Sequence, residues 1–140
     1  MTWLAIETST DACSCALGDE EEVQVRHEVA PRRHAALILD MVNDLLAERG
    51  MGAKALDGIF FGRGPGSFTG VRLAAGVAQG LAFGAGIPGV AVSTLHTVAQ
   101  GVARERGASR VLAAFDARMG EVYWGLYSRA GPDDPLEPVG

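Results

Sequence analysis

The order of hydrophobic patterns along the chain constrains its fold more than any other feature. Residues 3–7, 12–17 and 23–29 form three short segments with the patterns of strands, and turn residues separate them. From His34 to Arg49 the spacing of apolar residues becomes helical, and Gly50 is a plausible stop signal. Three antiparallel strands followed by alternating helices and strands predict an α/β fold built in layers.

Shorter patterns divide the rest of the chain. Strands are expected at residues 56–61, 88–92, 110–115 and 121–127, and helices at residues 69–83 and 94–106. The tail, residues 130–140, contains three of the six prolines and no periodicity, so a loop or a truncation point is expected there. Residues 112–116 echo residues 4–7 before a turn and a strand, as a second copy of the opening unit would, although such an echo is also common by chance.

Composition excludes several classes of protein. The 140 residues are about one domain long, and 48% of them are apolar, so a chain disordered throughout is excluded. Twelve basic against 17 acidic residues give a net charge of −5, the wrong sign for binding nucleic acid by phosphate neutralisation alone. Glycine, at 19 residues, is nearly twice its average share of ~7%, whereas aromatic residues reach 6%, so small side chains must fill much of the interior.

The cysteines and the apolar segments predict a cytoplasmic protein. Cys13 and Cys15 lie two apart in a strand, where they share a face and are poorly placed to bond each other, so a reducing compartment fits. The first seven residues have no basic segment before the apolar ones, so no secretory signal is expected there. The longest uncharged apolar stretch, residues 80–92, is too short and too interrupted to span a bilayer.

A glycine-dense loop at residues 62–70 follows a strand and opens a helix. Such a loop can present backbone N–H groups to an anion, which makes Gly64 and Gly66 candidate cofactor-binding residues. However, the spacing fits neither a dinucleotide fingerprint nor a nucleotide P-loop, and the only lysine is Lys54. A tight turn with Ser67 or Thr69 capping the helix is the favoured interpretation.

The first turn offers a second candidate anion site. Thr8, Ser9 and Thr10 supply hydroxyls in a small space, as phosphate-handling hairpins do, although turns favour these residues for local hydrogen bonding anyway. No two of His27, His34 and His96 have metal-ligand spacing on one helix face, so we expect no metal site. Both cysteines have the pattern of small core residues and not of a Cys/His pair, so we expect no catalytic thiol.

Two helical segments present unusual surfaces. The apolar residues of the first helix cover an arc of roughly 200°, too wide for burial on one side, so the side near Leu37 and Met41 needs another helix or another chain. In the second helix Gly76, Gly80 and Gly84 repeat every four residues, and each costs roughly 1 kcal/mol relative to alanine. Close helix packing would offset that cost, against a partner or against this protein's own sheet or first helix. The candidate interface residues are Leu37, Met41, Leu45, Leu73, Gly76, Val77, Gly80 and Leu81.

Four stretches together resemble one family: residues 4–10, His34–Ala35, residues 62–72 and residues 115–123. They are similar to the TsaB (YeaZ) family of bacterial tRNA threonylcarbamoyladenosine biosynthesis proteins, and the resemblance covers nearly the whole chain. It implies the actin/hexokinase/Hsp70-type, ribonuclease H-like fold, with a mixed sheet, flanking helices and two related lobes. Residues 1–108 would then form the first lobe and residues 109–140 the opening strands of a truncated second lobe.

The resemblance also implies a function. The related transferase TsaD holds its metal through a His-xxx-His motif, and the matching positions here are Thr94 and Val98, so this chain is expected to be neither a transferase nor a metalloprotease. It would be a non-catalytic scaffold for TsaD, with the ATPase TsaE in the assembly, ATP or ADP at the level of the complex and tRNA bound through the partners. Alone, it would form a homodimer.

An enzyme of the same superfamily is the alternative. A small-molecule kinase or carbamoyl transferase would use residues 8–11 and 62–66 to bind ATP. The absent metal pair and the incomplete second lobe weigh against it.

Overall fold

The computed structural model describes all 140 residues, and its first part is a five-stranded mixed sheet. Its strands are β1 (Trp3–Glu7), β2 (Ala12–Gly18), β3 (Val23–Val29), β4 (Gly58–Gly62) and β5 (Gly89–Val92), in the order β3-β2-β1-β4-β5. The first three strands pair antiparallel, and β4 and β5 continue the sheet in parallel from β1. Parallel neighbours need long crossovers, which the intervening helices supply.

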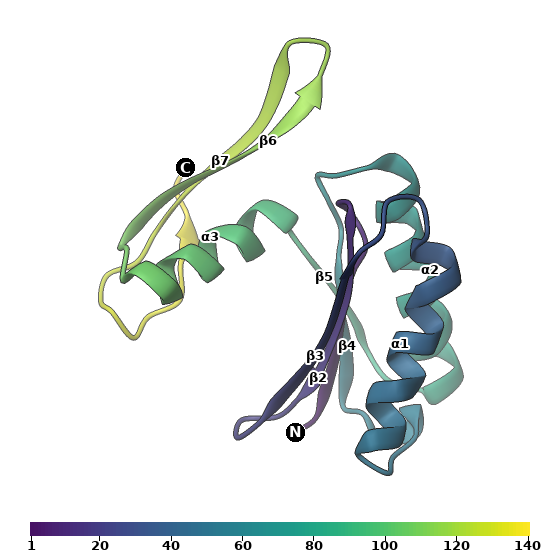
Figure 1. Cartoon of the computed structure of the whole chain (residues 1–140). Coiled ribbons are helices and arrows are strands. Elements are labelled where there is room, and N and C mark those ends of the chain that lie inside the picture. Colours follow the sequence, from purple (N-terminus) through teal and green to yellow (C-terminus); the bar gives the residue numbers. More distant parts are fainter.

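Two helices cover one face of this sheet (Figure 1). α1 (His34–Glu48) packs chiefly on β2, and α2 (Phe68–Ala85) packs on β4, while a short 3-10 turn, η1 (Ala53–Ala55), precedes β4. Small side chains on α2 let that helix lie close to the strands, because its inward positions are mostly alanines. The core between helices and sheet comprises Leu4, Ile6, Cys13, Cys15, Leu17, Ile38, Met41, Val42, Leu45, Leu46, Leu56, Ile59, Ala74, Ala78 and Ala82.

A second, smaller core lies around a separate three-stranded sheet. Its strands are β6 (Arg110–Arg118), β7 (Glu121–Ser128) and β8 (Glu137–Pro138), in that order, and α3 (Thr94–Arg106) packs on β6 and β7. The core residues are Leu95, Ala99, Ala103, Val111, Ala113, Tyr127 and Leu136. Figure 1 shows α3 beside these strands and apart from α1 and α2.

Most predicted elements agree with the structure to within about two residues at each end, the usual uncertainty of helix and strand boundaries. The tail was expected to have no regular structure, but residues 137–138 form β8, and the buried Leu136 just before them joins the second core. The packing of α3 on the second sheet means that the change of core falls near Ser93. The division into residues 1–108 and 109–140 stays a prediction.

Candidate functional site

The glycine-dense loop packs against the turn that follows β1. The backbone N–H of Ser67 donates to the carbonyl of Ser9 at 2.7 Å, and the hydroxyl of Thr8 donates to the carbonyl of Gly70 at 2.5 Å. A Cβ atom at Gly70 would overlap the carbonyl oxygen of Thr8, and one at Gly66 would overlap Ser9. These glycines therefore permit close backbone approach within the protein.

The candidate hydroxyls of this turn are used inside the fold. Thr8 and Ser9 are buried, and the hydroxyl of Ser9 lies 3.4 Å from that of Thr94. Thr10 is exposed, and its hydroxyl accepts from the N–H of Ala12 at 3.3 Å. This geometry favours the local-turn interpretation over phosphate binding.

Ser67 caps α2, as the favoured interpretation of the loop predicted. Its side chain accepts the N–H of Gly70 at 3.0 Å, which satisfies one of the free donors of the first helical turn. Thr69, the other candidate, does not cap the helix. Gly64 is buried and Gly66 is exposed, so the two glycines proposed for cofactor binding do not present one continuous open loop.

A polar cavity of about 330 Å³ lies where α1 and α2 begin. Thr10, Arg32, His34 and Thr69 are among its lining residues, and Nε2 of His34 lies 2.7 Å from the carbonyl oxygen of Thr10. The turn residue Thr10 therefore faces this cavity, whereas its buried neighbours in the turn do not.

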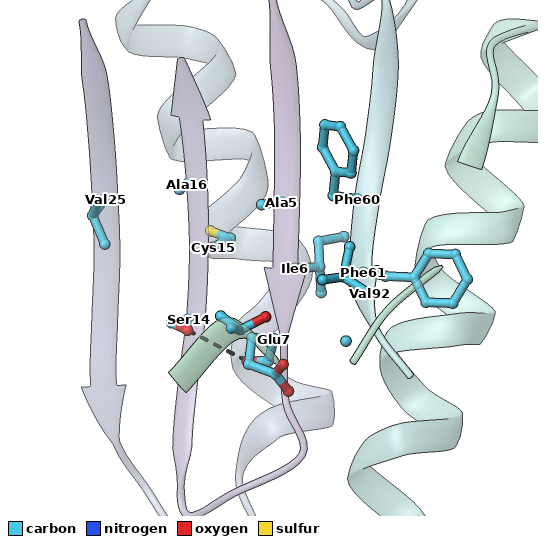
Figure 2. A pocket seen from close by; sticks show the side chains of 12 residues that line it. Ala5, Ile6, Glu7, Ser14, Cys15, Ala16, Val25, Phe60, Phe61 and Val92 are labelled. Atoms are coloured by element: carbon cyan, nitrogen blue, oxygen red, sulfur yellow. Dashed lines mark hydrogen bonds between the residues drawn. The ribbon is translucent and has the colours of Figure 1, made fainter. Parts of the chain in front are cut away.

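The face of the five-stranded sheet opposite α1 and α2 holds an apolar cavity of about 240 Å³. Strand pairing aligns Val25, Ala16, Ala5 and Phe60 in one row across four strands, as Figure 2 shows. Glu7 lies at the polar end of the cavity, and the N–H of Ser9 donates to its carboxylate at 2.8 Å.

The structure corrects the predicted surface of α1. Met41 and Leu45 were expected to face a partner, but Leu45 is fully buried and Met41 is 9% exposed, with its Sδ 3.6 Å from Sγ of Cys13. Both side chains form the core beneath the helix and are not available to another chain. Leu37 is only half-buried, so part of it remains on the surface.

The predicted surface of α2 is open. Gly76 and Gly80 are exposed, and a Cβ atom at either position would meet nothing within 4 Å. Leu73, Val77 and Leu81 are half-buried against the core at the edge of this face. We call Gly76, Gly80 and the flanking half-buried leucines and valine the glycine face. Its glycines are not explained by packing within this chain.

Two exposed apolar side chains near the glycine face were not predicted. Leu39 of α1 is 49% exposed, and Phe83 of α2 is 93% exposed. Ala35, one turn before Leu39 on the same side of α1, lines the same cavity as Leu73 of α2, so Leu39 is on the flank of α1 that faces α2. A helical wheel of α2 would have shown Phe83 opposite the alanine row.

The charged groups on the two helices differ. Arg72 is the only charged residue of α2, and its guanidinium lies 4.8 Å above the ring of Phe68. α1 carries Asp40, Asp44 and Glu48, all exposed, and Glu48 forms an ion pair with Arg26. On α2 the surface from Gly76 onward is therefore uncharged, and the exposed Arg72 lies one turn before Gly76 on the same side of the helix. The ion pair of Glu48 with Arg26 of β3 places that acidic residue on the side of α1 away from α2.

The structure shows no arrangement for metal or thiol chemistry. No group of three or more His, Cys, Asp or Glu side chains is placed to hold a metal ion. Burial, with a smaller contribution from Cys13, raises the pKa of the Cys15 thiol to about 12. Burial and the charge of Glu28 raise the pKa of Cys13 as well, so both thiols stay protonated near neutral pH.

The fold and the comparisons together define the class of protein. The sheet order, with helices on one face and a second sheet opening after α3, is that of a lobe of the actin/hexokinase/Hsp70-type fold. Residues 21–135 match the family model described as TsaD, tRNA N6-adenosine threonylcarbamoyltransferase. A solved structure of YeaZ from Pseudomonas aeruginosa matches with a TM-score of 0.92 and 53% identity, covering 99% of this chain and 64% of that one.

Similarity to curated relatives shows the branch of that family to which the chain belongs. The chain is 54% identical over 129 residues to the tRNA threonylcarbamoyladenosine biosynthesis protein TsaB of Escherichia coli, covering 92% of this chain and 56% of the relative. It is 38% identical to TsaB of Bacillus subtilis, and that match covers 91% of this chain and 55% of the relative. The chain belongs to the TsaB (YeaZ) branch of the threonylcarbamoyltransferase family. It spans about half the length of the curated relatives it matches.

No helix in the structure combines the length and the apolar character that crossing a membrane requires.

Proposed function

We propose that this chain acts in the synthesis of threonylcarbamoyladenosine in tRNA, as a non-catalytic scaffold that binds the TsaD-type transferase. The observation that carries the proposal is the open glycine face of α2. Gly76 and Gly80 weaken the helix by about 1 kcal/mol each relative to alanine, and nothing in this chain occupies the space they leave. A helix of a partner subunit, packed at short distance, is the physical use of that space.

The positions that match the metal motif of the transferase support a non-catalytic role. Thr94 is buried beside Ser9, and Val98 is exposed, so no imidazole pair stands there. His96 lies between them, but its ring stacks on Tyr127 at 4.8 Å and its Nε2 is 2.7 Å from the carbonyl oxygen of Leu136. This histidine holds the tail against the second core.

We assign the other partners from the net charge of the chain and from the complex with the transferase. A net charge of −5 supports tRNA contact mainly through the partner subunits, because phosphates repel an acidic surface. We place the TsaE-type ATPase and its ATP or ADP at the level of the complex, in the cytoplasm. Without the transferase, the glycine face would pair with its copy in a second chain as a homodimer, since a two-fold axis joins identical surfaces.

Reconstitution with E. coli TsaD, TsaE and tRNA tests the proposal. The wild-type chain should support tRNA modification, and Gly80→Leu should abolish that support while leaving the fold intact, because the new side chain enters open space in the free chain. Gly101→Leu is the matched control, since Gly101 is also an exposed helical glycine with nothing within 4 Å, but lies on α3. Full support by Gly80→Leu would contradict the proposal.

Calorimetry with ATP and magnesium on the isolated chain tests the enzyme alternative. Under the scaffold proposal we expect no tight metal-dependent binding and no turnover. Tight binding with turnover would instead favour a small-molecule kinase or carbamoyl transferase.

A further inference from the structure

Phe83 is the most exposed aromatic side chain of the protein. Its ring is 93% exposed in the last turn of α2, which ends at Ala85 and is capped by Gly86 in the left-handed conformation. A phenylalanine ring offers about 150–250 Å² of surface for burial. Because nearly all of it faces solvent, the ring contributes little to this fold.

The position of Phe83 places it on the exposed side of α2 with the glycines. At 100° per residue, Gly76, Gly80 and Phe83 lie within an arc of about 60°. Gly76 and Phe83 are seven residues apart, or about 10 Å along the helix axis. A partner helix that packs into the open space at Gly76 and Gly80 therefore also lies against the ring of Phe83.

The chemistry of the surrounding surface indicates an apolar occupant. From residue 73 to residue 85, α2 carries no charged side chain, and Arg72, on the same side of the helix, lies about 16 Å along the axis from Phe83. Phe68, the other exposed aromatic of α2, lies about four turns away, and the guanidinium of Arg72 already covers one side of its ring. Phe83 has no such partner within the chain.

We infer that Phe83 is an anchor residue of the interface with the transferase subunit, inserting its ring into an apolar pocket beside the helix that packs on Gly76 and Gly80. The inference rests on the proposed function and names a specificity-determining residue for it. Aromatic side chains at the centre of interfaces carry a disproportionate share of binding energy once they are fully covered. The matched family model is that of the transferase itself, so a partner of the same fold can present helices equivalent to α1 and α2.

Titration calorimetry of the chain with E. coli TsaD tests the inference. Phe83→Ala should weaken binding about 30-fold, the loss typical of a buried aromatic anchor, and Phe83→Leu should retain most of the affinity because it keeps an apolar side chain. Thermal unfolding of both variants should match that of the wild-type chain, since the ring is 93% exposed. Met119→Ala is the control, because Met119 is fully exposed in the β6–β7 turn, away from α2.

The outcomes separate the two claims. Wild-type binding that Phe83→Ala leaves unchanged would overturn the role of Phe83 and leave the scaffold proposal standing. An equal loss in Met119→Ala would also overturn it, since the effect would not be specific to α2. Failure of the wild-type chain to bind would count against the scaffold proposal itself.

Discussion

Glycine residues serve two different purposes in this protein. Gly66 and Gly70 allow the loop after β4 to touch the turn after β1, where any larger side chain would overlap backbone or side-chain atoms. Gly76 and Gly80 border open space, so the fold of the free chain does not require them. The same residue type is structural in the loop and, under the scaffold proposal, functional in the helix.

Replacement of Gly70 tests the structural role. A methyl group there must displace the carbonyl oxygen of Thr8, which cannot move cheaply, so Gly70→Ala should destabilise the fold by about 1–3 kcal/mol. Gly101→Ala, in open space on α3, should instead stabilise it by about 1 kcal/mol. Urea unfolding of the two variants measures the difference, and equal stabilities would contradict the close packing of the loop.

Cys15 gives a prediction for pH. Its pKa is about 12 in the folded chain and 9.0 in the absence of burial, so the folded state holds its proton where the unfolded state has lost it. Stability should be fully present below pH 9 and should fall as the pH rises from about 9 towards 12. Cys15→Ala should show a weaker fall in urea unfolding over the same range. An identical profile would mean that the thiol is not the titrating group.

Helix α2 has two rows of small residues, one that stabilises the fold and one that, under the scaffold proposal, serves association. Its inward row of alanines packs on β4, and its outward row of glycines faces solvent. A helix designed only for stability would carry alanine in both rows, because alanine is the best helix former. The outward glycines are therefore the part of α2 that the monomer does not explain.

The double variant Gly76→Ala/Gly80→Ala tests this separation. Each alanine should raise the stability of the free chain by about 1 kcal/mol, while the added methyl groups should weaken association with TsaD by about tenfold or more. Thermal unfolding and calorimetry measure the two effects, with Gly101→Ala as a control that changes only the first. A more stable chain that binds as tightly as wild type would show that the glycine spacing has no role in docking.

The sequence predicted the positions of the helices and strands better than it predicted which of them pack together. Periodicity located β1, α1 and α3 because each has a clear apolar pattern bounded by turn or capping residues. The roughly 200° apolar arc of α1 could not show which part of it faces the sheet, so Met41 and Leu45 were wrongly expected on the surface and Leu39 was missed. Similarly, the apolar side of α3 gave no indication that it would pack on the second sheet.

At the scale of the whole molecule, the chain has two cores joined near Ser93. A backbone hydrogen bond from Thr94 to the carbonyl of Gly64, at 3.0 Å, connects α3 to the glycine-dense loop. Leu136, fully buried, anchors the tail in the second core. The candidate site on α2 lies entirely on the first core, and the spacing of its glycines was visible in the sequence; only its openness required the structure.

Leu136→Ala tests the independence of the two cores. The cavity should destabilise the second core by about 2–5 kcal/mol and speed hydrogen exchange in β6 and β7. Amides of β1 and β4 should keep their protection, because their neighbours belong to the first core. Uniform loss of protection in both sheets would show one cooperative unit.

Sedimentation of an equimolar mixture with TsaD tests the central claim most directly. The wild-type chain and Gly101→Leu should both sediment with TsaD as a single heavier species, whereas Gly80→Leu should sediment separately from TsaD while remaining folded. Co-sedimentation of folded Gly80→Leu with TsaD, equal to that of wild type, would contradict the proposal that the glycine face of α2 is the docking surface.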